Sequence, residues 1–167
     1  GEPLKFFDAV VGGRSVGTPG TPALMAEAHR RWGRAEWSSL FEAGTRLAKD
    51  GFSVSPRLAS LIERDAERLS RFSRTADYFF PDGVALQAGD LLINDEYAHT
   101  LGVLAKKGAD GFYFGRIADE IVGAVTHAPG NPGVLSSMDL ALYKVKEREP
   151  VCVTYRAFEV CGMGPPS

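Results

Sequence analysis

Apolar side chains recur every three or four residues along most of the chain, which is the spacing of amphipathic helices. A Gly-rich, loop-like lead-in covers residues 1–20. The first helix is then expected with Thr21 as its N-cap, Pro22 at its first position and Gly33 as its stop. Its apolar stripe consists of Leu24, Met25, Ala28 and Trp32.

Two further helices are expected before residue 72. One should run from about Glu36 to Asp50, end at Gly51, and bury a face made of Trp37, Leu40, Phe41, Leu47 and Ala48. The other should begin at Ser55 as cap with Pro56 at its first position, and it carries the stripe Leu58, Leu61, Ile62 and Leu69. Its other face carries a charge run of mixed sign over residues 63–71, which is typical of a solvated helix face.

A cluster of four aromatic residues follows, and it is closed by a Pro81-Asp82-Gly83 turn. Base stacking or a ligand groove is one interpretation of such a cluster. No basic cluster accompanies it, so core packing under a loop is the favoured interpretation. The four residues are Phe72, Tyr78, Phe79 and Phe80.

Three more helices are expected in the second half. The first is capped by Asn94, reaches Lys107, stops at Gly108, and should turn Tyr97, Leu101 and Leu104 inward. The second follows Gly115 with a stripe of Ile117, Ile121, Val122 and Val125. After a loop over residues 129–133, Ser136 and Asp139 resemble a capping box for a short helix that carries Leu140 and Tyr143.

The last 20 residues change to a β-branched and aromatic pattern, which predicts a strand pair. A two-residue turn at Arg156-Ala157 would place Cys152 opposite Cys161 on a non-hydrogen-bonded pair, where Cα atoms approach most closely. A cross-strand disulfide is then geometrically allowed. Two half-buried thiols are the alternative, and Arg-Ala is weak turn chemistry because such turns favour residues with positive φ.

The predicted fold class is therefore mainly α with a C-terminal β-hairpin (α+β), in a single domain. It divides into the lead-in over 1–20, a helical region over 21–146 and a hairpin region over 147–163. The hairpin is expected to belong to a sheet whose other strands lie outside the chain. The 167 residues, 44% of them hydrophobic and 24% charged, suit one globular domain rather than a disordered tail.

Charge and hydropathy exclude several partners. The net charge of −2 shows no basic excess for nucleic acid, and no apolar run approaches the ~20 residues of a membrane span. The histidines, His29, His99 and His127, lie far apart without metal-ligand spacing. Gly12–Gly17 matches neither a phosphate loop nor a dinucleotide fingerprint, and Gly-x-Ser-x-Gly is absent.

Other side chains also fail to predict a reactive centre. Asp90 with Asp95, or Asp110 with Asp119, would pair only by chance of folding, and neither cysteine has a neighbouring base. We therefore assign no catalytic, substrate-binding or metal-binding residue and expect no cofactor.

Short blocks along nearly the whole chain resemble the large subunit of the γ-glutamyltranspeptidase family. They occur in that family's order and with similar spacing. Three departures from the family pattern are Pro22, Ala157 in place of a turn glycine, and Gly164 in place of a proline. The blocks are residues 16–20, 47–56, 112–118, 139–143 with 147–150, 155–158 and 163–167, which include Gly-Thr-Pro-Gly, Phe-Tyr-Phe-Gly-Arg-Ile-Ala and Tyr-Arg-Ala-Phe.

The resemblance implies an N-terminal-nucleophile hydrolase with an αββα fold. In such enzymes the precursor cleaves itself, and the new N-terminal threonine of a small subunit attacks a γ-glutamyl amide, with its α-amino group as base. The family's Thr-Thr-His-like segment would lie beyond residue 167, and Thr126-His127 is a poor imitation of it. The family's carboxylate-binding arginine stretch would lie upstream. No family site residue is therefore carried over.

The resemblance, together with Gly1-Glu2-Pro3 and Pro165-Pro166-Ser167, indicates a piece of a longer precursor that is inactive alone. Its implied partners are the rest of that precursor, which carries the threonine, and γ-glutamyl substrates for the parent enzyme. A self-contained helical interaction module without catalysis is the alternative. The compartment is undecided: a periplasmic or secreted parent would suit the thiol pair, and the chain contains no recognisable signal region. An isolated fragment should expose apolar surface and self-associate.

Overall fold

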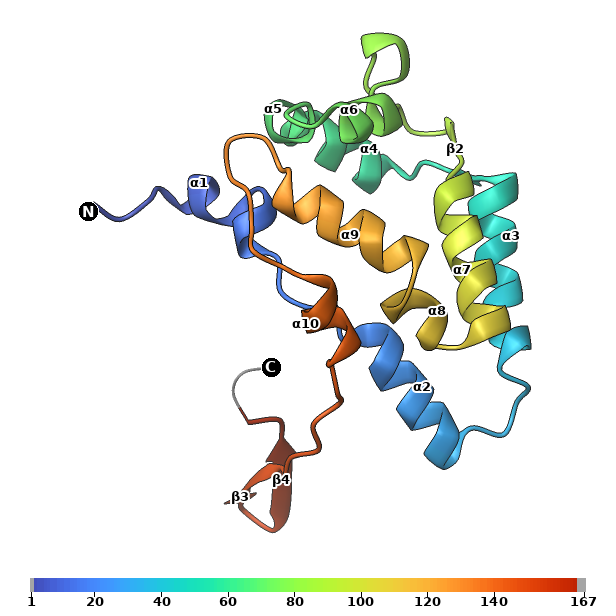
Figure 1. Cartoon of the computed structure of the whole chain (residues 1–167), viewed down its shortest axis with the longest axis vertical. Helices are drawn as coiled ribbons and strands as arrows, with labels where there is room; N and C mark the ends of the chain where they lie inside the picture. The colour runs from blue at the N-terminus through green and yellow to red at the C-terminus, as the bar shows by residue number, and fades with distance from the viewer. Residues whose placement is uncertain (1, 165–167) are drawn as a thin grey trace.

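The computed structural model describes residues 2–164, so residue 1 and the end of the 163–167 block lie outside the described part. Helices dominate it, and the predicted class of a mainly α chain with a C-terminal β-hairpin is confirmed (Figure 1). The helices are α1 (Phe6–Val10), η1 (Gly13–Ser15), α2 (Thr21–Trp32), η2 (Ser38–Phe41), α3 (Glu42–Asp50), α4 (Pro56–Arg64), α5 (Ala66–Leu69), α6 (Ser73–Phe79), η3 (Pro81–Gly83), α7 (Asp95–Lys107), α8 (Asp110–Tyr113), α9 (Arg116–Thr126) and α10 (Ser137–Ala141). The strands are β1 (Phe52–Ser53), β2 (Leu91–Leu92), β3 (Val151–Tyr155) and β4 (Phe158–Gly162).

Three predicted helix starts are confirmed by their capping hydrogen bonds. The Ser55 hydroxyl accepts from the Leu58 amide, and the Asn94 side chain accepts from the Tyr97 amide. At α10 the Ser136 hydroxyl accepts from the Asp139 amide, while the Asp139 carboxylate accepts from the Ser136 amide. Each cap satisfies a backbone donor that the first helical turn leaves unpaired.

The start of α2 differs from the prediction. Thr21 lies inside the helix, Gly20 is the N-cap without a side-chain cap, and Pro22 is the second helical residue. The Ala23 amide instead donates to the hydroxyl of Tyr113, 90 residues further along the chain. The lead-in also contains α1, where the Lys5 carbonyl accepts from two following amides; five residues are too few to show a helical period.

Several faces that were predicted to be buried are exposed. The stretch over 36–50 splits into η2 and α3, and it buries Phe41 and Ala48 but leaves Leu40 and Leu47 more than half exposed. Tyr97 also points outward, against expectation. No described element covers these side chains, so amphipathic spacing alone did not identify the buried side.

Contacts between distant segments create elements that the sequence pattern missed. β1 and β2 pair antiparallel, with Phe52 opposite Leu92 and Ser53 opposite Leu91. Short helices α6 and α8 were also missed, and the helix that begins at Pro56 is divided at Asp65 into α4 and α5. The long α3 and α7 lie side by side next to this region (Figure 1).

Within residues 2–164 the buried apolar side chains form three small cores instead of one. The first lies under α4–α6, and Tyr78, Phe79 and Phe80 pack against it, so the predicted core packing is confirmed for three of the four aromatics, without Phe72. The second joins Phe41 to α7, and the third joins Tyr113, Ala118 and Leu140. Phe112 packs against both the second and the third core.

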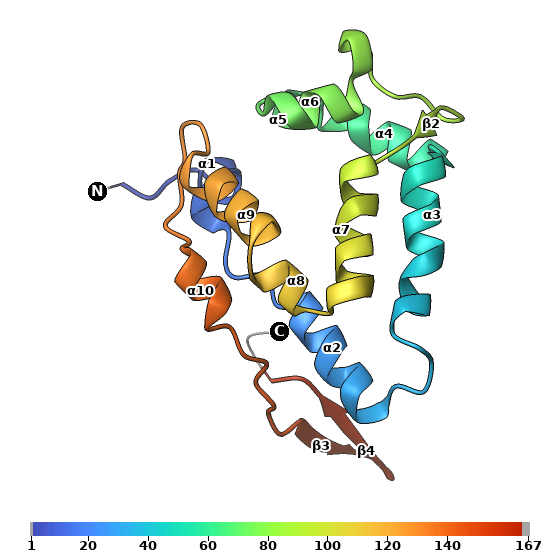
Figure 2. The ribbon, with the colours of Figure 1, turned by 45° about the vertical axis from the view of Figure 1, so that its right-hand side comes forward.

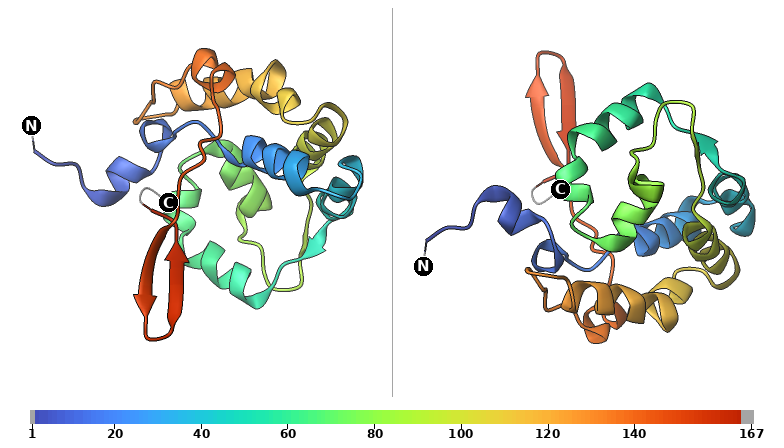
Figure 3. Two further views of the ribbon diagram at one scale, coloured as in Figure 1. Left: turned by 90° about the horizontal axis from the view of Figure 1, so that it is seen from below. Right: turned by 90° about the horizontal axis from the view of Figure 1, so that it is seen from above.

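The β3–β4 hairpin has the predicted register and projects from the end of the segment that follows α10 (Figures 1, 2 and 3). Every residue of both strands is exposed. Side chains alternate between two faces, and one face carries only apolar side chains: Val151, Val153, Tyr155, Phe158 and Val160. We call this set the apolar hairpin face.

The accessible surface is large for the mass of the chain. It measures 12,260 Å², whereas a compact monomer of 18.0 kDa has about 8,000 Å². No helix among residues 2–164 combines the length and apolar character required to cross a bilayer. Much apolar surface, including the apolar hairpin face, is left without a covering element in the described chain.

Candidate functional site

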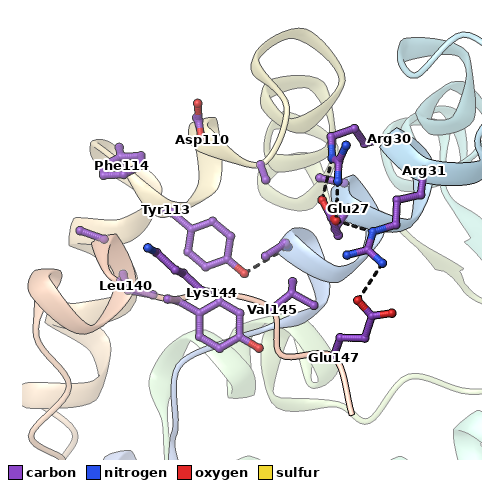
Figure 4. Close-up of a pocket in the computed structure, with 15 residues that line it drawn as sticks. Glu27, Arg30, Arg31, Asp110, Tyr113, Phe114, Leu140, Lys144, Val145 and Glu147 are labelled. Carbon is purple, nitrogen blue, oxygen red and sulfur yellow. Dashed lines mark hydrogen bonds and ion pairs between the residues drawn. The ribbon is translucent and has the colours of Figure 1, made fainter. Parts of the chain in front are cut away.

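A pocket of about 480 Å³ lies where α2, α8, α10 and the segment 143–147 meet (Figure 4). These segments come from both ends of the chain, and segment 143–147 leads directly toward the hairpin. Its lining combines aromatic rings with charged groups, which makes it a candidate for a ligand site in the helical region. The polar side chains around it are Glu27, Arg30, Arg31, Asp110, Tyr113, Tyr143, Lys144 and Glu147.

Tyr113 occupies the wall of this pocket and joins its elements. Its hydroxyl donates to the Pro19 carbonyl over 2.6 Å and accepts from the Ala23 amide over 3.2 Å. Its ring stacks on Tyr143, with 5.8 Å between centroids and 9° between planes. Burial raises the pKa of Tyr113, so the hydroxyl remains protonated as a donor.

A network of ion pairs forms the other side of the pocket. Glu27 pairs with Arg30 over 2.7 Å and also with Arg31, and hydrogen bonds from these two guanidinium groups lower the pKa of Glu27 to about 2. Arg31 also pairs with Glu147 over 2.8 Å. The network therefore ties α2 to the segment that precedes the hairpin.

The contacts around the pocket hold neighbouring segments together and do not form a reaction centre. Its arginines already bind Glu27 and Glu147, so no free guanidinium pair awaits a carboxylate ligand. The Tyr113 hydroxyl is engaged by two backbone groups. Nucleophilic catalysis needs a nucleophile within hydrogen-bond reach of a base, and the lining of this pocket supplies no such pair.

The structure keeps the three histidines apart. Nε2 of His29 lies 2.8 Å from the Ala35 carbonyl, and its ring contacts Trp37 edge-on. His99 lines a separate hollow of about 690 Å³ beside α7 and α9, together with the ion pair of Arg116 and Glu120.

His127 lies beside Thr126, but the two do not form a nucleophile and base. The Thr126 hydroxyl donates to the Val122 carbonyl over 2.8 Å. Nδ1 of His127 lies 2.9 Å from the Gly123 carbonyl, which can only accept, so Nδ1 carries the proton. That nitrogen therefore cannot take a proton from Thr126, 3.1 Å away.

The acidic residues considered as pairs have separate local surroundings. Asp90 accepts from the Gln87 amide in a turn. The first turns of α7, α8 and α9 contain Asp95, Asp110 and Asp119, where the helix dipole stabilises a negative charge.

The two cysteines are brought together by the hairpin. Their Cα atoms lie 4.1 Å apart, and their sulfur atoms are joined in a disulfide. In the described part of the chain, the group of Cys152, Glu159 and Cys161 is the one cluster of potential metal ligands. Spacing along the sequence did not indicate it, because the residues meet across two strands.

Sequence and structure comparisons define the class of protein. The family model for γ-glutamyltranspeptidase matches residues 2–167, and the chain belongs to this family. Among individual relatives, the glutathione hydrolase proenzyme of Bacillus subtilis (strain 168) is 32% identical over the whole chain, which spans 28% of that relative. The acylase ACY 1 proenzyme of Pseudomonas sp. (strain SE83) is 33% identical over 95% of the chain and 28% of the relative.

The solved structures agree with this assignment. The crystal structure of Helicobacter pylori γ-glutamyltranspeptidase superposes with a TM-score of 0.90 and 33% identity, over 98% of this chain and 46% of the other. The chain thus spans little more than a quarter of the curated relatives and about half of this solved chain.

Proposed function

We propose that this chain is the supporting part of an enzyme that transfers or hydrolyses γ-glutamyl groups through a threonine acyl-enzyme. The rest of the same precursor supplies the threonine nucleophile and the binding site for the γ-glutamyl carboxylate. The observation that carries the proposal is the family match over residues 2–167, joined to the glutathione hydrolase relatives of which this chain spans 28%. The chain alone is expected to be inactive.

The chemistry of the described side chains supports this division of labour. An amide-cleaving threonine needs a base that can accept its proton, and Thr126 with His127 lacks that capacity. The arginines beside the Tyr113 pocket are already paired with Glu27 and Glu147. These groups position segments of the chain and leave bond cleavage to residues elsewhere in the precursor.

The exposed surface supports a covering partner. The apolar hairpin face has Val153 60% and Phe158 70% exposed, and Arg31 with Glu147 orients the segment that precedes it. A self-contained helical interaction module would be expected to bury such side chains, and its surface would be closer to about 8,000 Å². The rest of the precursor is the partner that fits, and the isolated chain is expected to self-associate through the same face.

The decisive assay compares the full precursor and the 167-residue chain with a γ-glutamyl anilide, with buffer as the blank. The full precursor from the parent gene should release the aniline, while the 167-residue chain alone should release none above buffer. Turnover by the isolated chain that survives repurification would contradict the inactive role. Absence of turnover by a correctly folded and processed full precursor would contradict the γ-glutamyl activity itself.

An acylase with another acyl group is the second candidate, because the acylase ACY 1 proenzyme is as similar to this chain as the glutathione hydrolase proenzyme. The full precursor should therefore also be assayed with an N-acyl amide that lacks the α-amino and α-carboxyl groups of glutamate. A higher kcat/KM for the γ-glutamyl substrate is expected. The reverse order would assign the protein to the acylase side of the family.

A further inference from the structure

The face of the hairpin opposite the apolar hairpin face carries a cluster of thiol and carboxylate groups. Cys152 faces Cys161 and Thr154 faces Glu159 in the ladder. Side chains two residues apart on a strand share a face, so both sulfur atoms and the Glu159 carboxylate lie on the same side. One ligand atom from each of the three residues lies within 4.8 Å of the others.

These three groups match the requirements of a soft or borderline divalent cation. Zn²⁺ binds thiolate sulfur at ~2.3 Å and carboxylate oxygen at ~2.0–2.2 Å, so two tetrahedral ligand atoms lie about 3.5–3.8 Å apart. The three ligand atoms lie within 4.8 Å of one another, and the two sulfur atoms, which are bonded in the disulfide, separate toward that spacing once the bond is reduced. All three residues are exposed, so a hydrated ion can reach them and keep water in the fourth position.

We infer that, when the disulfide is reduced, the sulfur atoms of Cys152 and Cys161 and the Glu159 carboxylate form a three-ligand site for Zn²⁺ or a similar thiophilic cation. A dithiol or phosphine reductant supplies two electrons, the S–S bond breaks, and each sulfur takes one proton. Metal binding then releases these two protons as both thiolates coordinate. The disulfide and the metal use the same sulfur atoms, so the two states exclude each other.

The pairing of the two strands brings the three ligand residues together. The antiparallel register of β3 and β4 places the two cysteines opposite each other, and we expect the backbone hydrogen bonds to keep this register when the disulfide is reduced. A metal bound to both sulfur atoms crosslinks the same loop as the disulfide does. The two strands therefore remain crosslinked in reducing as well as oxidising conditions. This inference does not depend on γ-glutamyl chemistry.

The test uses the 167-residue chain, reduced and freed of reductant under anaerobic conditions. Equilibrium dialysis should show one Zn²⁺ per reduced chain and none per oxidised chain. Titration with Cd²⁺ should produce the ultraviolet charge-transfer band of cadmium bound to two thiolates. A second readout is the Hα–Hα contact between residues 154 and 159 by NMR, which reports the intact ladder in each state.

Three variants separate the ligands. Cys152→Ser should abolish uptake, and Glu159→Gln should weaken it by no less than the ~10–100-fold that loss of an outer-shell partner costs. Glu149→Gln is the matched control, because Glu149 is exposed and lies outside the ladder, and it should leave affinity unchanged. Any of three results would overturn the site: no saturable uptake by the reduced chain, one metal per two chains, or equal affinity of Glu159→Gln and the unaltered chain.

Discussion

Replacement of Tyr113 by phenylalanine removes one hydroxyl from the junction of α2, α8 and α10. The ring, its burial and its stacking on Tyr143 are all retained, because only the oxygen is lost. The Pro19 carbonyl loses its donor at 2.6 Å and the Ala23 amide loses its acceptor at 3.2 Å. Ala23 is the third residue of α2, so its amide has no partner within the helix and Tyr113 serves as its cap.

The expected cost follows from these two bonds. A lost helix cap costs ~0.5–2 kcal/mol, and a hydrogen bond from a buried hydroxyl contributes about 1 kcal/mol. Tyr113→Phe should therefore lower the free energy of unfolding by about 2 kcal/mol. With a urea dependence of ~1–3 kcal/mol per molar, the unfolding midpoint should fall by about 1 M. Urea titration followed by circular dichroism measures this shift.

Tyr143→Phe is the matched control, since Tyr143 is the stacking partner of Tyr113 whereas the hydrogen bonds to Pro19 and Ala23 belong to the Tyr113 hydroxyl. It should move the midpoint much less than Tyr113→Phe does. The pH dependence adds a second signature. Burial raises the pKa of Tyr113, so the folded chain holds this proton more tightly than the unfolded chain, and stability falls as pH rises above ~10. Above that pH, the difference in unfolding midpoint between the unaltered chain and Tyr113→Phe should become smaller. Equal midpoints for Tyr113→Phe and Tyr143→Phe would refute the capping role.

Three other predictions concern α2 and the hairpin. The pKa of Glu27 is about 2 in the folded chain and 4.5 ordinarily, so its contribution to stability is present above pH 4.5 and is lost as pH falls toward 2. Glu27→Gln should therefore flatten that part of an acid-unfolding curve, and an unchanged slope would contradict the pairing. Arg156 has φ of 56°, so Arg156→Gly should stabilise the hairpin by about 1 kcal/mol and slow amide exchange in β3 roughly fivefold. Ala157→Gly is the control, because residue 157 does not have a positive φ, and it should not slow this exchange. The unaltered chain should show concentration-dependent sedimentation that Val153→Lys abolishes and Thr154→Lys, on the opposite face, does not; a monomer at all concentrations would contradict self-association.

The cysteine pair of the hairpin shows how much of this region could be predicted from the sequence. Equal strand lengths around Arg156-Ala157 were enough to place Cys152 opposite Cys161, because antiparallel register follows from the position of the turn. The departure from the family glycine is at Ala157, whereas the positive φ of the turn falls on Arg156. Glu159 was not recognised beside the cysteines, since a search for spaced ligands along the sequence does not test groups across a ladder.

By itself the sequence determined the features whose partners are close in the chain. The caps at Ser55, Asn94 and Ser136 bind amides only three residues away, so the adjacent residues encode them completely. The tertiary structure alone decided that Tyr113 caps α2 across 90 residues and that Arg31 binds Glu147 across 116. It also decided which side of the 36–50 stretch is buried. Such contacts depend on the path of the whole chain, and periodicity within one helix carries no information about that path.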